Sequence, residues 1–154
     1  MKILVLSDSH GNVGLMRNLF SLDNYRAVIF LGDVVRDADQ LARYTGAVPV
    51  YKVRGNCDFF GCTAYETQFI EIEGKKIFMA HGHTYSVKGG IGAFTTAARK
   101  IGADIALFGH THIQYYNLSD GMHILNPGAI ANGKYAEITI QNNNTSIELR
   151  NIND

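Results

Sequence analysis

The sequence predicts an α/β fold with a central pair of β-sheets and helices outside them, and two observations lead to this expectation. In the first part of the chain, short continuous apolar runs alternate with helix-like stretches, as in α/β proteins. Strand-like pairs joined by turn residues, at 67–78, 113–125 and 134–150, add hairpins that a single doubly wound sheet would not contain. With 154 residues and 46% hydrophobic content, residues 1–154 are expected to form one domain.

Five apolar runs predict the main strands. Their apolar residues are continuous rather than alternating, which indicates strands that are covered on both faces. Hairpin turns are predicted at 73–75, which reads EGK, at Asp120-Gly121 and in the asparagine run at 142–144. The five runs are KILVLS at 2–7, AVIFLG at 27–32, VPVYKVRG at 48–55, KIFMAHG at 76–82 and DIALFGH at 104–110.

Helices are expected between these strands. The first spans 12–22 with Asn12 as its N-cap, and the second spans 37–45 with Asp37 in the same role. Asn and Asp suit this position because their side-chain oxygens accept hydrogen bonds from the first free N–H groups of a helix. A third helix is expected over 90–101.

The charge balance excludes several classes of partner. Fourteen Lys and Arg residues balance fourteen Asp and Glu residues, so no surplus positive field exists to attract nucleic acid or an anionic membrane. Any bound anion must be held by a local site. The N-terminal apolar stretch is too short for a signal peptide, and no run approaches the roughly 18 apolar residues that span a bilayer. A cytoplasmic protein without a membrane partner is expected.

Metal-competent side chains follow the predicted strands. The carboxyl ends of strands in α/β sheets gather along one rim, where ligands bind. Five of the six histidines lie in the three segments SDSH, AHGH and GHTH, and this clustering argues against histidines that merely satisfy the core. The expected metal ligands are Asp8, His10, Asp33, Asn56, His81, His110 and His112.

This set of ligands predicts two metal ions. Carboxylate, amide and imidazole donors suit Mn²⁺, Fe, Co²⁺ or Zn²⁺, and the set is too large for one tetrahedral ion. It divides into two sites if Asp33 bridges them. Ions paired about 3.5 to 4 Å apart are used to hydrolyse phosphate esters. The first ion would take Asp8, His10 and His112, and the second would take Asn56, His81 and His110.

The order of these motifs resembles the calcineurin-like metallophosphoesterase family. The motifs D-x-H, GD, GN, H and G-H-x-H appear here as Asp8-Ser9-His10, Gly32-Asp33, Gly55-Asn56, His81 and Gly109-His110-Thr111-His112, and NPGA at 126–129 extends the likeness. The resemblance implies a four-layer α-β-β-α sandwich of two mixed sheets flanked by helices. It also implies two divalent ions, foremost Mn²⁺, with Ni²⁺, Fe, Co²⁺ or Zn²⁺ as alternatives.

Cys57 departs from the pattern of most family members, which have a histidine after the asparagine, near the scissile phosphate. The GNCD stretch with the downstream NPG is similar to the compact YfcE-type phosphodiesterases, and this likeness implies diester substrates. A thiol with a pKa of about 8.5 donates a proton less readily than imidazolium at about 6.5. Weaker protonation of the leaving group, or its supply by water or another side chain, is therefore expected. Cys57 and Cys62 are expected to be reduced.

Three further residues are candidates for roles around the metals. Asp58, grouped with Asn56 and Cys57 as a catalytic candidate, would orient a ligating histidine or cap a loop. Arg54 would contact phosphate or lie on the surface. His83 would line the pocket or touch substrate, without joining the metal ligands.

Taken together, these features predict a phosphoric diester hydrolase. Its expected substrate is a small phosphodiester, attacked by a hydroxide that bridges the two ions. The alternative is a protein-interaction scaffold of the same fold, resembling the retromer small subunit, with little or no catalysis. The complete ligand set favours the enzyme. A homo-oligomer stays open, because an exposed hairpin such as the one around Asp120 can form a dimer contact.

Overall fold

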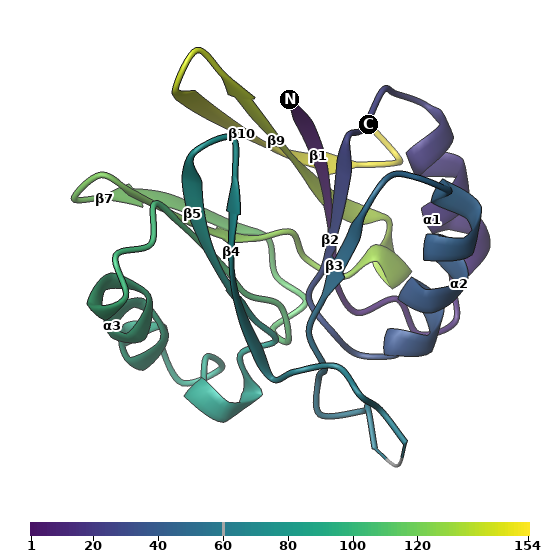
Figure 1. Cartoon of the computed structure of the whole chain (residues 1–154). Coiled ribbons are helices and arrows are strands. Elements are labelled where there is room, and N and C mark those ends of the chain that lie inside the picture. The colour runs from purple at the N-terminus through teal and green to yellow at the C-terminus, as the bar shows by residue number, and fades with distance from the viewer. Residues whose placement is uncertain (60) are drawn as a thin grey trace.

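Two five-stranded sheets lie face to face, with helices on both outer faces, in the computed structural model, which describes residues 1–59 and 61–154 (Figure 1). The first sheet has the order β10-β9-β1-β2-β3 and the second has the order β4-β5-β6-β8-β7. The first contains β1 (Lys2–Leu6), β2 (Ala27–Phe30), β3 (Val50–Lys52), β9 (Lys134–Gln141) and β10 (Asn144–Asn151). The second contains β4 (Thr67–Ile72), β5 (Lys75–Ala80), β6 (Ile105–Leu107), β7 (Tyr115–Ser119) and β8 (Met122–Asn126).

Both sheets are mixed. In the first, β1, β2 and β3 run parallel, and β9 and β10 are antiparallel additions at one side. In the second, β5, β6 and β8 run parallel, and β4 and β7 pair antiparallel at the two edges. The hairpin turns lie where they were predicted, and their residues Glu73, Asp120, Asn142 and Asn143 have positive φ. The four-layer sandwich of mixed sheets is thereby confirmed.

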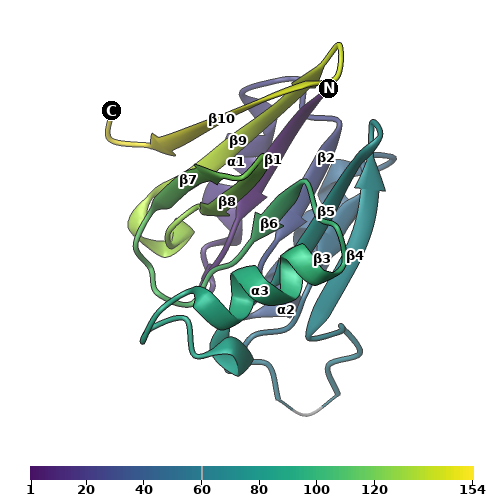
Figure 2. The same cartoon turned by 90° about the vertical axis from the view of Figure 1, so that its left-hand side faces the viewer.

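Helices form the two outer layers. Helices α1 (Val13–Ser21) and α2 (Val35–Thr45) cover the first sheet, and α3 (Gly92–Lys100) covers the second (Figure 2). The short 3₁₀ helices η1 (His83–Tyr85) and η2 (Ile130–Asn132) follow β5 and β8. Within the described residues, no helix has the length and apolar character that a membrane crossing requires.

The layers explain the continuous apolar runs. Successive side chains of a strand point to opposite faces, so a strand between a sheet and a helix layer needs an apolar residue at every position. In β1, Ile3 and Val5 pack into the cluster between the sheets, whereas Leu4 and Leu6 pack against α1 and α2. All four are fully buried. A third cluster, built around Phe94, joins the second sheet to α3.

The start of α2 corrects one expectation. The helix begins at Val35, after Val34 in the left-handed region, so Asp37 lies in the first turn and is not the N-cap. The Val35 N–H donates instead to Asp58 Oδ1 at 2.7 Å, from a loop distant in sequence. Asp37 is thus free to accept hydrogen bonds from Ser9 Oγ and the Gly11 N–H, both at 2.7 Å.

Glu137 on β9 is a buried charged residue that contacts side chains from several segments of the first sheet. The Tyr25 hydroxyl donates to its Oε1, Lys2 Nζ lies 3.1 Å from the same oxygen, and Arg150 Nε donates to Oε2 at 3.1 Å. Burial acts to raise the pKa of Glu137, but the hydrogen bonds from Tyr25, Lys2 and Arg150 outweigh it and lower that pKa. The carboxylate therefore contributes to stability in its ionised form.

Glu137→Gln is expected to lower the free energy of unfolding by about 2 kcal/mol, because an amide N–H group would face one of the donors now bound by the carboxylate. Urea unfolding at pH 7 measures the loss. Since the folded pKa is lowered, the charge contributes above the ordinary glutamate pKa of about 4.5, and its contribution is lost as the pH falls through the folded pKa. The matched control is Glu148→Gln, on an exposed partner of Arg150, which should change stability by less than about 0.5 kcal/mol. Equal losses in the two variants would contradict this account.

Candidate metal centre

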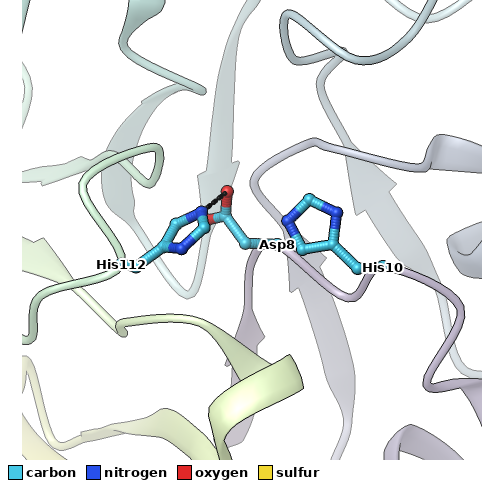
Figure 3. A group of neighbouring side chains, drawn as sticks. All are labelled: Asp8, His10 and His112. Carbon is cyan, nitrogen blue, oxygen red and sulfur yellow. Dashed lines mark ion pairs between the residues drawn. The ribbon is translucent and has the colours of Figure 1, made fainter.

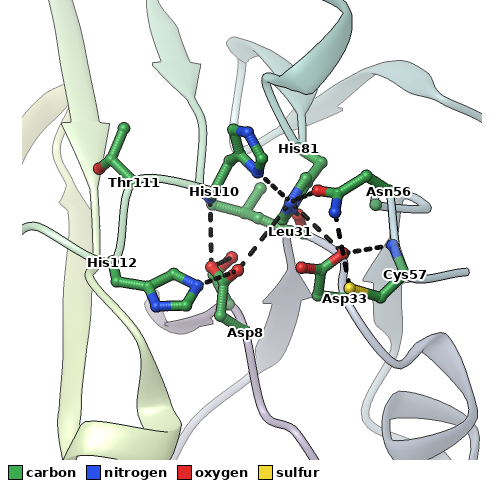
Figure 4. Close-up of polar contacts among 12 residues, drawn as sticks. Asp8, Leu31, Asp33, Asn56, Cys57, His81, His110, Thr111 and His112 are labelled. Carbon is green, nitrogen blue, oxygen red and sulfur yellow. Dashed lines mark hydrogen bonds and ion pairs between the residues drawn. The ribbon is translucent and has the colours of Figure 1, made fainter. Parts of the chain in front are cut away.

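The parallel strands of both sheets end at the same rim, and the predicted ligands extend from these ends (Figure 4). In the first sheet, β1, β2 and β3 each lead into a loop that carries a predicted ligand, and β5 and β6 do the same in the second. The structure brings these side chains together from segments that are up to about a hundred residues apart. They are Asp8 and His10 after β1, Asp33 after β2, Asn56 after β3, His81 after β5, and His110 and His112 after β6.

Two overlapping groups of donor atoms form the centre. In the first group, donor atoms of Asp8, His10 and His112 lie within 4.8 Å of one another, and Asp8 lies between the two imidazole rings (Figure 3). His112 Nε2 is 3.1 Å from Asp8 Oδ1. In the second group, Asp8, Asp33 and His81 meet the same distance limit. Asp8 thus belongs to both groups.

The buried His81 ring connects the remaining ligands. Its Nδ1 lies 2.7 Å from the Leu31 carbonyl, which accepts only, so Nδ1 carries a proton and Nε2 is the nitrogen that can present a lone pair. Around Nε2 lie Asn56 Oδ1 at 3.1 Å, His110 Nδ1 at 3.2 Å and Asp33 Oδ1 at 3.4 Å. All seven predicted ligands are therefore linked by short distances.

These contacts fit divalent cations. The lone pairs of His81 Nε2, Asn56 Oδ1 and Asp33 Oδ1 face one another with no hydrogen between them, an arrangement that repels unless positive charge lies among them. Asp8 Oδ1 is fully buried and accepts no hydrogen bond from any residue that the structure describes. The hard and borderline donors of this set are those that Mn²⁺, Fe, Co²⁺ and Zn²⁺ accept.

Histidine protonation is consistent with metal binding at the same atoms. Burial lowers the pKa of His110, and the neighbouring His81 lowers it further. The ring is therefore neutral near pH 7 and offers a lone pair. Burial acts to raise the pKa of Asp33, but the hydrogen bond from the Cys57 N–H and the electrostatic influence of the neighbouring His81 imidazole outweigh it and lower that pKa. The Asp33 carboxylate is thus ionised.

Five of the seven predicted ligands have a left-handed backbone conformation. Non-glycine residues adopt the left-handed region rarely, and each such residue costs roughly 1–3 kcal/mol unless its surroundings enforce it. Here the strained conformation turns side chains from loop backbone toward the rim. The ligands with positive φ are Asp8 (54°), His10 (44°), Asp33 (58°), His110 (66°) and His112 (61°).

Three glycines make room for these side chains. A Cβ added at Gly55 would lie 2.2 Å from Asp33 Oδ1, and one added at Gly109 would lie 2.0 Å from Ser7 Oγ. At Gly32 a Cβ would lie 2.7 Å from the Gly55 nitrogen and 2.9 Å from His81 Nδ1. The glycines that precede Asp33, Asn56 and His110 are therefore required by the close packing of one ligand loop on another.

Sequence reasoning missed the residues that fix the loops. Asn126 is fully buried, and its Nδ2 donates to the Gly109 carbonyl at 2.8 Å and to Thr111 Oγ1 at 3.0 Å. It therefore holds the loop that carries His110 and His112. Its place in the NPGA motif was the available signal. Asp37 fixes the loop that carries His10 in a similar way, and was expected instead as a helix cap.

Comparison with known proteins agrees with this geometry. Residues 1–142 match the model of the calcineurin-like phosphoesterase superfamily domain. The chain belongs to this superfamily. The phosphodiesterase YfcE of Escherichia coli is 26% identical to it, and the alignment covers 85% of this chain and 80% of YfcE.

Solved structures of the same superfamily fold superpose closely. A predicted phosphoesterase from Streptococcus pneumoniae is 26% identical and has a TM-score of 0.83, with 97% of this chain and 88% of the other covered. Vps29 of Entamoeba histolytica, solved in complex with Zn²⁺, has a TM-score of 0.76 over 98% of this chain and 99% of its own. Its identity of 23% shows a common fold alone.

Cys57 lies next to the predicted ligands and contacts one of them through its backbone. Its N–H donates to Asp33 Oδ1 at 2.9 Å, and its exposed thiol accepts from Asn56 Nδ2 at 3.5 Å. Partial burial first, and then the Asp33 carboxylate, raise the pKa of the thiol. The thiol is therefore protonated at neutral pH. Cys57 and Cys62 are both free cysteines and form no disulfide.

The other candidate residues have contacts of their own. The Asp58 carboxylate accepts hydrogen bonds from the Val35 and Gly55 N–H groups, at 2.7 and 2.8 Å, so it caps backbone and does not orient a histidine. Arg54 pairs with Glu66 at 2.8 Å. The half-buried His83 ring lies 5.5 Å from the His81 ring, and among described residues its buried Nδ1 has no hydrogen-bond partner. Burial, then His81, lowers the pKa of His83.

Gly55→Ala is expected to weaken Mn²⁺ binding by about 10- to 100-fold, because the new methyl group would displace the Asp33 carboxylate. Isothermal titration of the chelator-stripped protein measures the change. Gly14→Ala is the matched control, since its Cβ would meet nothing within 4 Å in α1 and should add about 0.5–1 kcal/mol of stability without altering metal affinity. Unchanged affinity in Gly55→Ala would refute the packing argument.

Proposed function

We propose that this protein is a metal-dependent phosphodiesterase that hydrolyses a small phosphodiester at a dinuclear centre. The observation that carries the proposal is the convergence of donor atoms on the buried Nε2 of His81, next to Asp8 Oδ1, which accepts no hydrogen bond from any described residue. Asp8, Asp33 and His81 are buried, and acceptor atoms that face one another there are unfavourable unless a cation lies among them.

The ligands divide between two ions, with Mn²⁺ as the expected metal. Asp8, His10 and His112 hold the first ion, as their shared distance limit of 4.8 Å supports. Asn56, His81 and His110 hold the second, supported by distances of 3.1 and 3.2 Å from His81 Nε2. Asp33 would be the ligand shared by both ions, and Asp8 belongs to both groups of donor atoms.

The chain prepares this site for an anionic ester. Two bound divalent ions would lower the pKa of a water nucleophile and offset the negative charge of the phosphate. Asp8 and Asp33 place two carboxylates beside the ions, so the net charge left over is small and positive, and it attracts a diester monoanion to a chain with no net charge. This local charge replaces the basic surface that a nucleic-acid enzyme would need.

Substrate contacts and proton supply fall to nearby side chains. His83 is neutral, because its pKa is lowered, and its unpartnered Nδ1 is available to a phosphate oxygen or ester oxygen. Arg54 reaches substrate only if it leaves Glu66. The thiol of Cys57 is a weaker acid than a free thiol because its pKa is raised, so water or another side chain donates the proton to the leaving group.

The name of the E. coli relative, a phosphodiesterase, supports diesters over monoesters as the substrate class. The alternative function is a protein-interaction scaffold with little catalysis, and the likeness to Vps29 concerns the fold alone. The single domain over 1–154, the cytoplasmic location and a homo-oligomer stay predictions.

The two functions differ in metal uptake and turnover. Chelator-stripped protein supplied with Mn²⁺, Ni²⁺, Mg²⁺ or Zn²⁺ is expected to bind two ions per chain and to hydrolyse bis(p-nitrophenyl) phosphate faster than p-nitrophenyl phosphate. Metal analysis and release of p-nitrophenolate measure both properties. A well-folded protein that binds no metal and hydrolyses neither ester would support the scaffold.

Asp33→Ala is expected to abolish diester hydrolysis and to lower the metal content, because the ligand shared by both ions is lost. Cys57→Ala should cost less than about tenfold in kcat, because the backbone N–H that contacts Asp33 remains. Steady-state kinetics and metal analysis of both variants test the difference. Comparable losses in the two variants would overturn the minor role assigned to the thiol.

A further inference from the structure

An apolar pocket of 330 Å³ lies beside the loop that carries His110 and His112. Its floor is formed by Phe108 and Val87, which are 2% and 4% exposed, and Ile91 and Tyr115 form its walls. The floor is part of the aromatic cluster between the second sheet and α3. The pocket is therefore built on rigid core and not on a mobile surface.

The pocket is lined by a residue of the loop that carries two predicted metal ligands. Thr111, between His110 and His112, lines the pocket, and Figure 4 shows it on the side of the centre away from Asp33. Its Oγ1 accepts hydrogen bonds from Asn126 Nδ2 at 3.0 Å and from the Ile113 N–H at 3.2 Å. Thr111 is thus held in place between the pocket and the loop residues His110 and His112.

The rim of the pocket combines one exposed apolar side chain with one cation. Ile113 is 67% exposed, although it is large and apolar. Lys88 lies close enough for its charge to act on His110, and the described part of the chain places no carboxylate within ion-pair distance of it. An occupant that is apolar at one end and anionic at the other matches this rim.

We propose that this pocket binds a ring-sized apolar ester group of the phosphodiester, so that diesters with an aryl or bulky alkyl arm are preferred. The volume supports one arm and not a whole ligand, because it is near the lower limit of the ~300–1,000 Å³ usual for small-molecule sites. The apolar floor and walls offer few partners to a sugar or a base. The inference rests on the proposed phosphodiesterase function, since the phosphate is what places the ester group here.

Binding of two diesters to the Zn²⁺-loaded protein, measured while phosphorus-31 spectra show both diesters intact, tests the proposal without relying on catalysis. Diphenyl phosphate is expected to bind about tenfold more tightly than dimethyl phosphate, because the pocket accepts only the ring. It should also shift the methyl resonances of Val87, Ile91 and Ile113 in carbon-13 spectra, because a bound ring lies against them. Equal affinities, or shifts confined to methyl groups elsewhere, would overturn the proposal.

Ile113→Ser tests the rim directly. The preference for diphenyl phosphate should fall to less than about threefold, because the variant loses apolar contact with the ring. The matched control is Leu118→Ser, on β7 outside the pocket, where a side chain of similar size is 55% exposed. The control should keep the tenfold preference. Both positions are exposed, so both variants should fold, and amide spectra verify this. If Ile113→Ser keeps the tenfold preference for diphenyl phosphate, the proposal is wrong.

Turnover of bis(p-nitrophenyl) phosphate by the same samples separates this inference from the proposed function. Turnover without any preference for diphenyl phosphate would refute the pocket and leave the hydrolase intact. Binding of diphenyl phosphate at Val87, Ile91 and Ile113 without turnover would refute the hydrolase and support the pocket. If neither diester moves these methyl groups, the proposal is wrong, and a protein segment becomes the better occupant.

Discussion

The hydrogen bond between His81 Nδ1 and the Leu31 carbonyl, 2.7 Å long, determines the chemistry of the rim. It crosses from the second sheet to the first, and it fixes which nitrogen of the buried ring carries a proton. The opposite nitrogen must then present its lone pair to Asn56, His110 and Asp33. A different tautomer would make the same side chains an ordinary hydrogen-bonded cluster. As arranged, their oxygen and nitrogen atoms are suited to a cation.

The backbone around the predicted ligands is strained and closely packed. Left-handed conformations at Asp8, Asp33 and His110 are unfavourable in isolation, yet they persist because buried contacts on both sides specify them. Gly55 and Gly109 allow neighbouring loops to approach within distances that no Cβ permits. The layers of apolar side chains provide the rigidity that this local strain requires.

Sequence periodicity predicted the layers and the position of most strands, since an apolar residue at every position of 2–6 requires cover on both faces. Spacing after strands predicted which side chains share the rim. The sequence offered capping as one of two roles for Asp58, but it could not predict that α2 is the element capped or that Asp37 fixes the loop of His10, because both contacts join segments about 25 residues apart. A carboxylate two residues into a helix also looks locally like a cap, which explains the error at Asp37.

The side chains that stabilise this fold are different from the side chains to which the chemistry is assigned. The cluster between the sheets is aliphatic throughout, and it contains none of the ligands at the rim. An ancestral gene could therefore exchange a histidine or an aspartate at the rim and still yield a folded product. Such a lineage would be free to use the unchanged surface for another function. A disruptive change between the two sheets would instead remove the fold and, with it, every function of the protein.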